Sequence, residues 1–139
     1  MGLLPDIDKE KTKEQVDSLL SQYRSFVRYA RDQFEPKITV TYHLEMTSQT
    51  NVIHNPIEDA IVLQTTAEEE LCAINKAYNK LGTEKRRRLY DKYMRRTELT
   101  NLQLAEKYIE STSTFYRELG KAQYEFAEAY CGGSLMIFK

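Results

Sequence analysis

Apolar residues recur at helical spacing from the N-terminal part of the chain onward. The first series alternates steps of four and three residues: Val16, Leu20, Tyr23, Val27, Ala30 and Phe34. This spacing predicts one long helix from Thr12 to Phe34, and Thr12 and Gln15 have the spacing of a capping box at its start. A partner helix must cover the series. It can come from this chain, or from a second copy that associates through the first helix.

Residues 35–55 follow a different pattern. Pro36 ends the first helix, and residues 38–42 alternate with β-branched side chains, which favours a short strand or an extended segment. We interpret residues 35–55 as a linker, with room for a small β-hairpin. It separates an N-terminal helical segment, residues 1–34, from a helical domain, residues 56–139.

A second helix is predicted to begin at Asn55 and Pro56, which suit the cap and the first helical position. Its apolar positions continue to residue 81, and Gly82 suits a helix C-terminus. Thr66 and Glu69 have capping-box spacing near the middle, so this stretch can be one helix or two helices in series.

A third helix is predicted to begin at Thr83, and it carries much of the positive charge. Residues 83–96 hold seven Lys or Arg among fourteen residues, around an apolar face of Leu89, Tyr90, Tyr93 and Met94. The net charge is −4 for residues 1–82 and +3 for residues 83–139. The basic residues can form a solvated surface, but their excess favours phosphate contact for part of it.

Four hydroxyl residues, 111–114, interrupt the last apolar series. Thr100 and Gln103 form a capping-box pattern before a short helix from Asn101 to Tyr108, in which Leu102, Ala105 and Tyr108 are available to pack. Ser111 suits the cap of a second, longer helix. The apolar stripe of that helix is Phe115, Leu119, Ala122, Phe126 and Tyr130. A short helix, a short turn and a longer helix predict a helix-turn-helix at residues 100–130.

The fold class predicted from these elements is all-α. No run of about 18 apolar residues is present, so no membrane contact is expected. Cys72 and Cys131 are far apart in the sequence and suit two reduced thiols, and His43 and His54 do not complete a zinc-binding spacing with them. A glycine-rich phosphate loop and a nucleophile–base pair are also missing from the sequence, so we expect no metal, no cofactor and no enzymatic activity.

Residues 104–122 resemble the last DNA-binding module of bacterial sigma factors. The shared features are an apolar residue and Ala105, a polar pair, a turn, Ser113 and Thr114 before an apolar residue, and Arg117. The chain is more similar to the ArpU-type phage transcriptional regulators, which are comparable to the RinA late-gene activators of phages of Gram-positive bacteria. The matching motifs are Ser-Thr-Phe-Tyr-Arg at 113–117 and Phe-Ala-Glu-Ala-Tyr at 126–130.

This resemblance implies a sequence-specific regulator that binds double-stranded DNA in the cytoplasm of a bacterial host. It implies a phage or prophage activator of late packaging and lysis genes that also contacts host RNA polymerase. In a helix-turn-helix the start of the second helix reaches the base edges in the major groove. The expected base-reading residues are Thr112, Ser113, Tyr116 and Arg117. The expected phosphate-contacting residues are Thr100, Thr114, Lys121, Arg86 and Arg88.

Each of these residues also has a structural alternative. The hydroxyl residues can act only as caps, Arg117 and Lys121 can pair with Glu118 and Glu125, and Tyr116 can lie at the edge of the core. The turn departs from the family pattern, because Ile109 and Glu110 stand where Gly and an apolar residue are usual. A left-handed backbone would strain Ile109, so we expect a wider or differently wound turn. The alternative function is a helical assembly or adaptor protein of phage DNA packaging.

Overall fold

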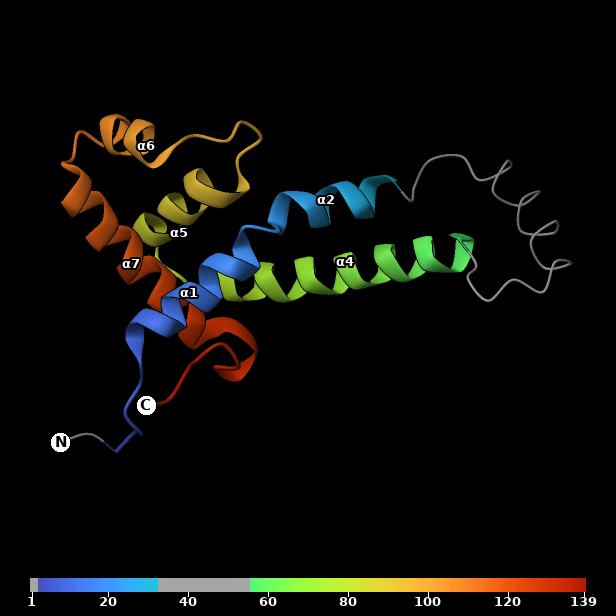
Figure 1. Cartoon of the computed structure of the whole chain (residues 1–139), viewed down its shortest axis with the longest axis horizontal. Helices are drawn as coiled ribbons and strands as arrows, with labels where there is room; N and C mark the ends of the chain where they lie inside the picture. The colour runs from blue at the N-terminus through green and yellow to red at the C-terminus, as the bar shows by residue number, and fades with distance from the viewer. Residues whose placement is uncertain (1–2, 33–55) are drawn as a thin grey trace, which may run out of the picture. The chain divides into compact units, whose positions relative to one another are not determined.

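The computed structural model describes residues 3–32 and 56–139 of the protein (Figure 1). Within these ranges the regular secondary structure is helical, and β-pairing is limited to an isolated bridge between Ile7 and Phe138. The prediction of an all-α fold is confirmed. Phe34 and the linker or hairpin expected at 35–55 lie outside the described residues.

The chain divides into two compact units. One consists of Met1–Arg24 together with Ala73–Lys139, and the other of Ser25–Cys72. In the second unit Ala30 and Ala67 are buried, on α2 (Tyr23–Asp32) and α4 (Pro56–Asn79) respectively. The three-part division expected from the sequence stays a prediction.

The single N-terminal helix predicted from Thr12 to Phe34 is wrong, because the chain forms two helices. The first, α1 (Lys9–Leu20), ends two residues before the second, α2, begins. At the break, the side-chain amide of Gln22 donates to the carbonyl of Ser18 at 3.1 Å. In a continuous helix that carbonyl would accept the backbone N–H of Gln22. The Gln22 N–H bonds to the carbonyl of Leu19 instead, at 3.1 Å.

The start of α1 also differs from the prediction. Asp8 is the N-cap, and its carboxylate accepts a hydrogen bond from the backbone N–H of Lys11 at 3.1 Å. Thr12, predicted to be a cap residue, is fully buried one turn inside the helix. Its hydroxyl oxygen accepts the backbone N–H of Ile137 at 3.0 Å, so it holds the C-terminal tail rather than the helix start.

Helix α4 begins at Pro56, as predicted, and continues without a break to Asn79. The alternative of two helices meeting near Thr66 is therefore wrong, and the good helix formers Ala67 and residues 68–70, three glutamates, follow this residue directly. Gly82 does not end α4 in a left-handed conformation. It is the extended N-cap of α5 (Thr83–Leu89), with φ −71° and ψ 166°, so its predicted role is also wrong.

Helix α5 begins at Thr83, as predicted, and then widens into a π-helical turn, η1 (Tyr90–Met94). The backbone N–H of Arg95 bonds to the carbonyl of Tyr90, five residues earlier. The wider turn changes which side chains face inward. Asp91 and Tyr93 are buried, whereas Tyr90, predicted to be apolar core, is exposed.

The core of the larger unit lies around α7 (Thr112–Ala129), which packs against α1, α5 and α6 (Asn101–Lys107) and is followed by a short 3-10 turn, η2 (Tyr130–Gly132). Figure 1 shows α7 in orange-red, between α1 and α6. Val16 and Leu20 of α1 are fully buried in this unit. For these two residues of the predicted N-terminal series, the covering partner comes from within the chain. Self-association through the first helix stays a prediction.

Candidate nucleic-acid interface

Helix α6 begins with the predicted capping box. The Thr100 hydroxyl accepts the backbone N–H of Gln103 at 3.1 Å, and the Gln103 side chain accepts the backbone N–H of Thr100 at 2.9 Å. Ala105 is buried, as predicted, together with Leu104. Leu102, which was also predicted to pack, is 60% exposed. The capping box therefore fixes the start of α6, and Leu104 and Ala105 form its buried part.

The turn after α6 is wound in the left-handed manner that glycine usually supplies. Ile109 has φ +56° and its side chain is 93% exposed. The backbone N–H of Ile109 bonds to the carbonyl of Glu106, and that of Glu110 bonds to the carbonyl of Ala105. These two bonds are the Schellman pattern that ends many helices. The expected wider turn is wrong, and an isoleucine takes the strained position instead.

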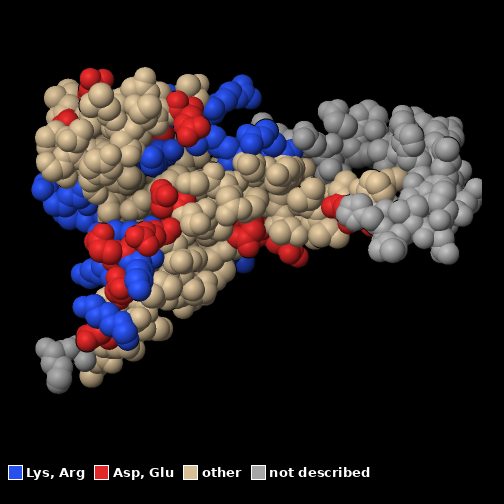
Figure 2. Space-filling model, viewed as in Figure 1, with Lys and Arg blue, Asp and Glu red and all other residues tan. Residues whose placement is uncertain are grey.

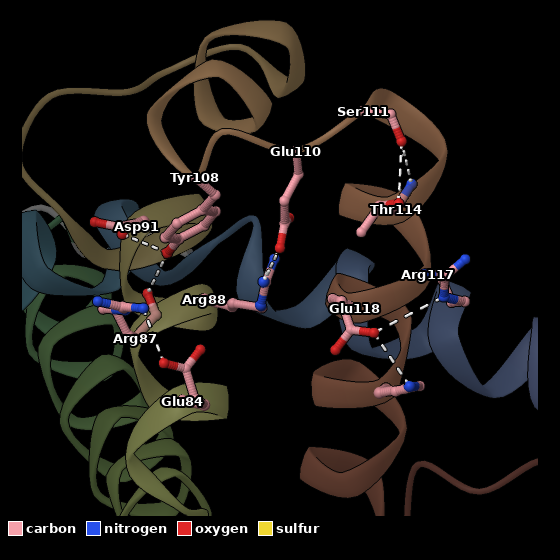
Figure 3. A network of polar contacts seen from close by, with 11 residues as sticks. Glu84, Arg87, Arg88, Asp91, Tyr108, Glu110, Ser111, Thr114, Arg117 and Glu118 are labelled. Atoms are coloured by element: carbon pink, nitrogen blue, oxygen red, sulfur yellow. Dashed lines mark hydrogen bonds and ion pairs between the residues drawn. The ribbon is translucent and has the colours of Figure 1, made fainter.

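Glu110, the second unusual residue of the turn, is held by an arginine of α5. Its two carboxylate oxygens accept hydrogen bonds from Nη1 and Nη2 of Arg88, at 3.0 and 2.5 Å (Figure 3). The Arg88 guanidinium also lies over the ring of Tyr108, 4.6 Å from its centroid. Because the Arg88 side chain is only 9% exposed, this bidentate pair is largely shielded from water. The pair joins the turn to α5 at the position where an apolar residue is usual in the family pattern.

A second buried carboxylate holds the end of α6. Asp91, in η1, accepts hydrogen bonds from the hydroxyl of Tyr108 at 2.5 Å and from Nζ of Lys107 at 3.1 Å. Arg95 adds an ion pair at 3.3 Å. Asp91 and Arg88 thus connect the same helix end to η1 and α5, as Figure 3 shows for Tyr108 and Glu110.

These contacts shift the acid–base properties of the groups involved. Burial raises the pKa of the Asp91 carboxyl, but the hydrogen bonds from Tyr108 and Lys107 lower it more, and the net pKa lies below its ordinary value of 3.8. The hydrogen bond from Arg88 holds the pKa of Glu110 below 4.5. Burial and the bond to Asp91 raise the pKa of the Tyr108 hydroxyl well above its usual range. Near neutral pH both carboxyls are charged and Tyr108 is a donor.

Helix α7 begins at the predicted cap. The Ser111 hydroxyl accepts the backbone N–H of Thr114 at 3.2 Å and donates to the Thr114 hydroxyl at 3.0 Å (Figure 3). The predicted apolar stripe is buried along its length: Phe115, Leu119, Ala122, Phe126 and Tyr130. The predictions of the cap and of the buried side of α7 are confirmed. The two unusual features of this region therefore lie in the turn before the cap.

The residues expected to read bases lie outside the buried stripe, at the N-terminal end of α7. Thr112, Ser113, Tyr116 and Arg117 are all exposed within the first two turns of the helix. The Tyr116 hydroxyl accepts a hydrogen bond from the side-chain amide of Asn101, at the start of α6, at 3.1 Å. Arg117 lies 3.8 Å from Glu118, a loose contact with both side chains partly in water. The structure thus brings these four residues together on one accessible surface, the reading face.

The residues expected to contact phosphate are less uniform. Thr100 and Thr114 lie at the starts of α6 and α7, and Lys121 lies one turn beyond Arg117, 3.1 Å from Glu118. Arg86 is half-buried on α5. Arg88 is committed to Glu110 inside the protein, a geometry that disfavours its expected contact with phosphate.

Asn101 and Glu110 both contact residues of this region, although the sequence reasoning gave no role to Asn101 and identified Glu110 only as an unusual residue of the turn. Asn101 orients Tyr116 through its amide, and its carbonyl oxygen accepts a hydrogen bond from Lys92 at 2.7 Å. The signal for Asn101 was its place directly after the capping threonine. For Glu110 the signal was a charge in a position where the family has an apolar residue.

The described residues form neither a group of metal ligands nor a membrane-spanning helix. In residues 3–32 and 56–139, no three His, Cys, Asp or Glu side chains are grouped so that they could hold a metal ion. Cys72 and Cys131 are exposed free thiols. No helix in these same ranges has the length and apolar character needed to cross a membrane. His43 and His54 lie outside the described residues.

Comparison with known proteins gives one informative match. The chain is 30% identical over 136 residues to a protein of Streptococcus phage O1205 named "Putative autolysin regulatory protein ArpU". The alignment covers 97% of this chain and 98% of that relative. No protein-family model and no solved structure matches the chain. Because a relative of this identity matches over almost its whole length, the chain belongs to the ArpU family of phage regulatory proteins.

Proposed function

We propose that this protein is a sequence-specific transcriptional regulator that binds double-stranded DNA through a helix-turn-helix formed by α6 and α7. The observation that carries the proposal is the division of α7 into two sides. Its apolar stripe is buried against the rest of the unit, while Thr112, Ser113, Tyr116 and Arg117 are exposed at its start. A helix that presents polar residues at its N-terminal turns can enter the major groove.

The residues of the reading face have complementary chemistry. Arg117 can donate two hydrogen bonds to guanine, and Tyr116 can contact a thymine methyl group. Thr100 and Thr114, at the starts of α6 and α7, would fix the register by contacting phosphates, with Lys121 and Arg86 adding charge. We do not include Arg88 in this set, since Glu110 occupies its guanidinium.

We further propose that the protein activates late genes of a phage or prophage, including a lysis gene, in the cytoplasm of the host cell. The name of the relative from phage O1205 refers to regulation of an autolysin. Activation would require a contact with host RNA polymerase, and self-association through the first helix would suit a two-part operator. In this proposal the protein acts by binding DNA and polymerase, and it catalyses no reaction.

The test is DNA binding across a salt series, using fragments of the genome that flank the gene and scrambled fragments of equal length. Arg117→Ala should lose about 1–3 kcal/mol of discrimination between the preferred and scrambled DNA. Arg117→Lys is the matched control, because it keeps the charge and loses the fork that recognises guanine. It should keep the salt dependence and lose discrimination. Absence of DNA binding by the wild-type protein at low salt would contradict the proposal.

A further inference from the structure

A hollow with a volume of about 340 Å³ lies on the larger unit, where α1 and α5 meet one side of α7. Four lysines from three helices line it: Lys9 and Lys13 of α1, Lys85 of α5 and Lys121 of α7. The ring of Tyr124 and the carboxylates of Glu125 and Glu128 complete the lining. Figure 2 shows Lys and Arg side chains interleaved with Asp and Glu in the region that α1 and α7 occupy in Figure 1. We call this feature the lysine hollow.

The lysines are held near the hollow by weak contacts. The ammonium group of Lys9 lies over the Tyr124 ring, 5.3 Å from its centroid. Lys85 is 3.4 Å from Glu125, and Lys121 is 3.1 Å from Glu118, with more than a third of each lysine side chain exposed. Exposed pairs of this kind contribute little to stability, so an incoming phosphate can replace the carboxylate at little cost.

Gly120 is the position of α7 against which the end of the Lys13 side chain lies. A Cβ atom at position 120 would lie 3.1 Å from Nζ of Lys13 and 3.4 Å from its Cε. The end of the Lys13 side chain therefore lies against α7 at a position where the helix has no side chain. Its Nζ also pairs with Glu10 of α1 at 3.4 Å, and 29% of the Lys13 side chain is exposed.

The two hollows at this crossing differ in charge. The second shares Lys13 and Gly120 with the lysine hollow, and the rest of its lining includes Glu10, Glu14 and Asp17 beside Tyr116. A polyanion that follows α7 would be attracted more strongly to the lysine hollow than to these carboxylates. The charge distribution therefore selects the flank of α7 that carries Lys121.

The lysine hollow continues the reading face. Arg117, Lys121 and Tyr124 follow one another along the same side of α7 at steps of four and three residues. At 1.5 Å per residue, Arg117 and Tyr124 are separated by roughly 10 Å along the helix axis, which is comparable with the width of the major groove. A backbone strand bordering the groove read by Arg117 would reach the hollow directly.

We propose that the lysine hollow is a second contact for the phosphate backbone, which adds α1 to the DNA-binding surface. This inference rests on the proposed function and extends it, because it assigns DNA contact to Lys9, Lys13 and Lys85, outside the helix-turn-helix. The hollow supplies affinity without reading sequence, since phosphates are the same at every base pair.

The test compares two double variants of the full chain with equal loss of charge. Lys9→Gln with Lys85→Gln removes two lysines of the hollow, and Lys11→Gln with Lys80→Gln removes two exposed lysines outside it. Glutamine keeps much of the apolar stem, and circular dichroism checks the fold. In a salt titration the first variant should flatten the slope of log K against log salt by about two, and the control should leave it nearly unchanged. Discrimination between preferred and scrambled DNA should stay at the wild-type level.

The outcomes separate the two proposals. Equal slopes for the two double variants would overturn the lysine hollow as a contact, while loss of discrimination by Arg117→Ala would still support the proposed function. A flattened slope in the hollow variant, with wild-type protein that shows no sequence preference, would support the phosphate contact and contradict sequence-specific reading. Absence of wild-type binding at low salt would overturn both.

Discussion

Ile109 is a β-branched residue in a backbone conformation that usually belongs to glycine. Its φ of +56° costs an L-residue roughly 1–2 kcal/mol. Its side chain is 93% exposed, so little packing offsets the strain. The two backbone bonds of the turn and the pair between Glu110 and Arg88 hold the conformation in place. The sequence identified position 109 as unusual, but it did not reveal that these contacts outweigh the preference of the residue.

We expect Ile109→Gly to raise the free energy of unfolding by about 1 kcal/mol, because it removes the strain and loses almost no buried surface. Urea denaturation would measure the change as a higher midpoint at an unaltered slope. Ile109→Ala is the control, since alanine keeps a Cβ and the strain. If glycine and alanine give the same midpoint, strain at this position is not the cause.

At the scale of elements, the ion pair between Arg88 and Glu110 joins α5 to the turn that precedes α7. We expect Arg88→Ala to destabilise the protein by about 2–3 kcal/mol, because it leaves the Glu110 carboxylate partly buried without its partner. Arg88→Met combined with Glu110→Leu should recover most of this loss, since an apolar pair can replace a buried ion pair.

Arg87 provides a matched control for this prediction on the same helix. It pairs with Glu84 at 2.9 Å, and both side chains are more than half exposed. Arg87→Ala should therefore change the free energy of unfolding by less than about 0.5 kcal/mol. Thermal or urea unfolding would measure all three variants. A loss at Arg87 equal to that at Arg88 would show that charge, and not burial of the pair, governs the effect.

The sequence predicts elements well where a local interaction decides them. Thr100 and Ser111 are caps at the predicted positions because a cap needs only a side chain and an N–H three residues on. The break at Gln22 was not predicted. It depends on whether the backbone N–H or the side-chain amide of Gln22 donates to the Ser18 carbonyl. The inward turn of Asp91 also escaped, because the π-helical turn η1 shifts the helical period there.

At the scale of the whole molecule, stability should depend on pH on the acid side. The pKa values of Asp91 and Glu110 are both lowered in the folded protein. A lowered carboxyl pKa stabilises the fold fully above the ordinary values of 3.8 and 4.5, and this stabilisation is lost as the pH falls through the lowered values.

We expect the melting temperature to fall as the pH is lowered below about 4.5, and less steeply in Glu110→Gln than in the wild type. The variant should be less stable than the wild type at pH 7, because Arg88 loses its charged partner. Thermal melts from pH 7 to pH 3 would measure both effects. A variant whose melting temperature follows the wild-type curve in parallel would exclude Glu110 as a contributor to the acid sensitivity.

The arrangement of helices is the part of the fold that sequence reasoning could not supply. Helical spacing showed that Val16 and Leu20 needed a covering partner, but periodicity gives no information about which helix provides it. The packing of α1 on α7 joins two segments that lie far apart in the sequence, and the contact of Lys13 with Gly120 is one that apolar spacing does not show. Lys9 and Lys13 were not predicted to contact DNA, because they belong to the acidic part of the sequence, residues 1–82.

The packing of α1 on α7 also bears on how the protein is made. Roughly 90 residues separate the two helices. At the usual rate of synthesis, about 5–20 s pass between the synthesis of α1 and the synthesis of α7. During that time the apolar side of α1 leaves the ribosome without its partner. A nascent chain halted before residue 112 would expose Val16 and Leu20, and it would be a natural substrate for chaperones that bind apolar segments.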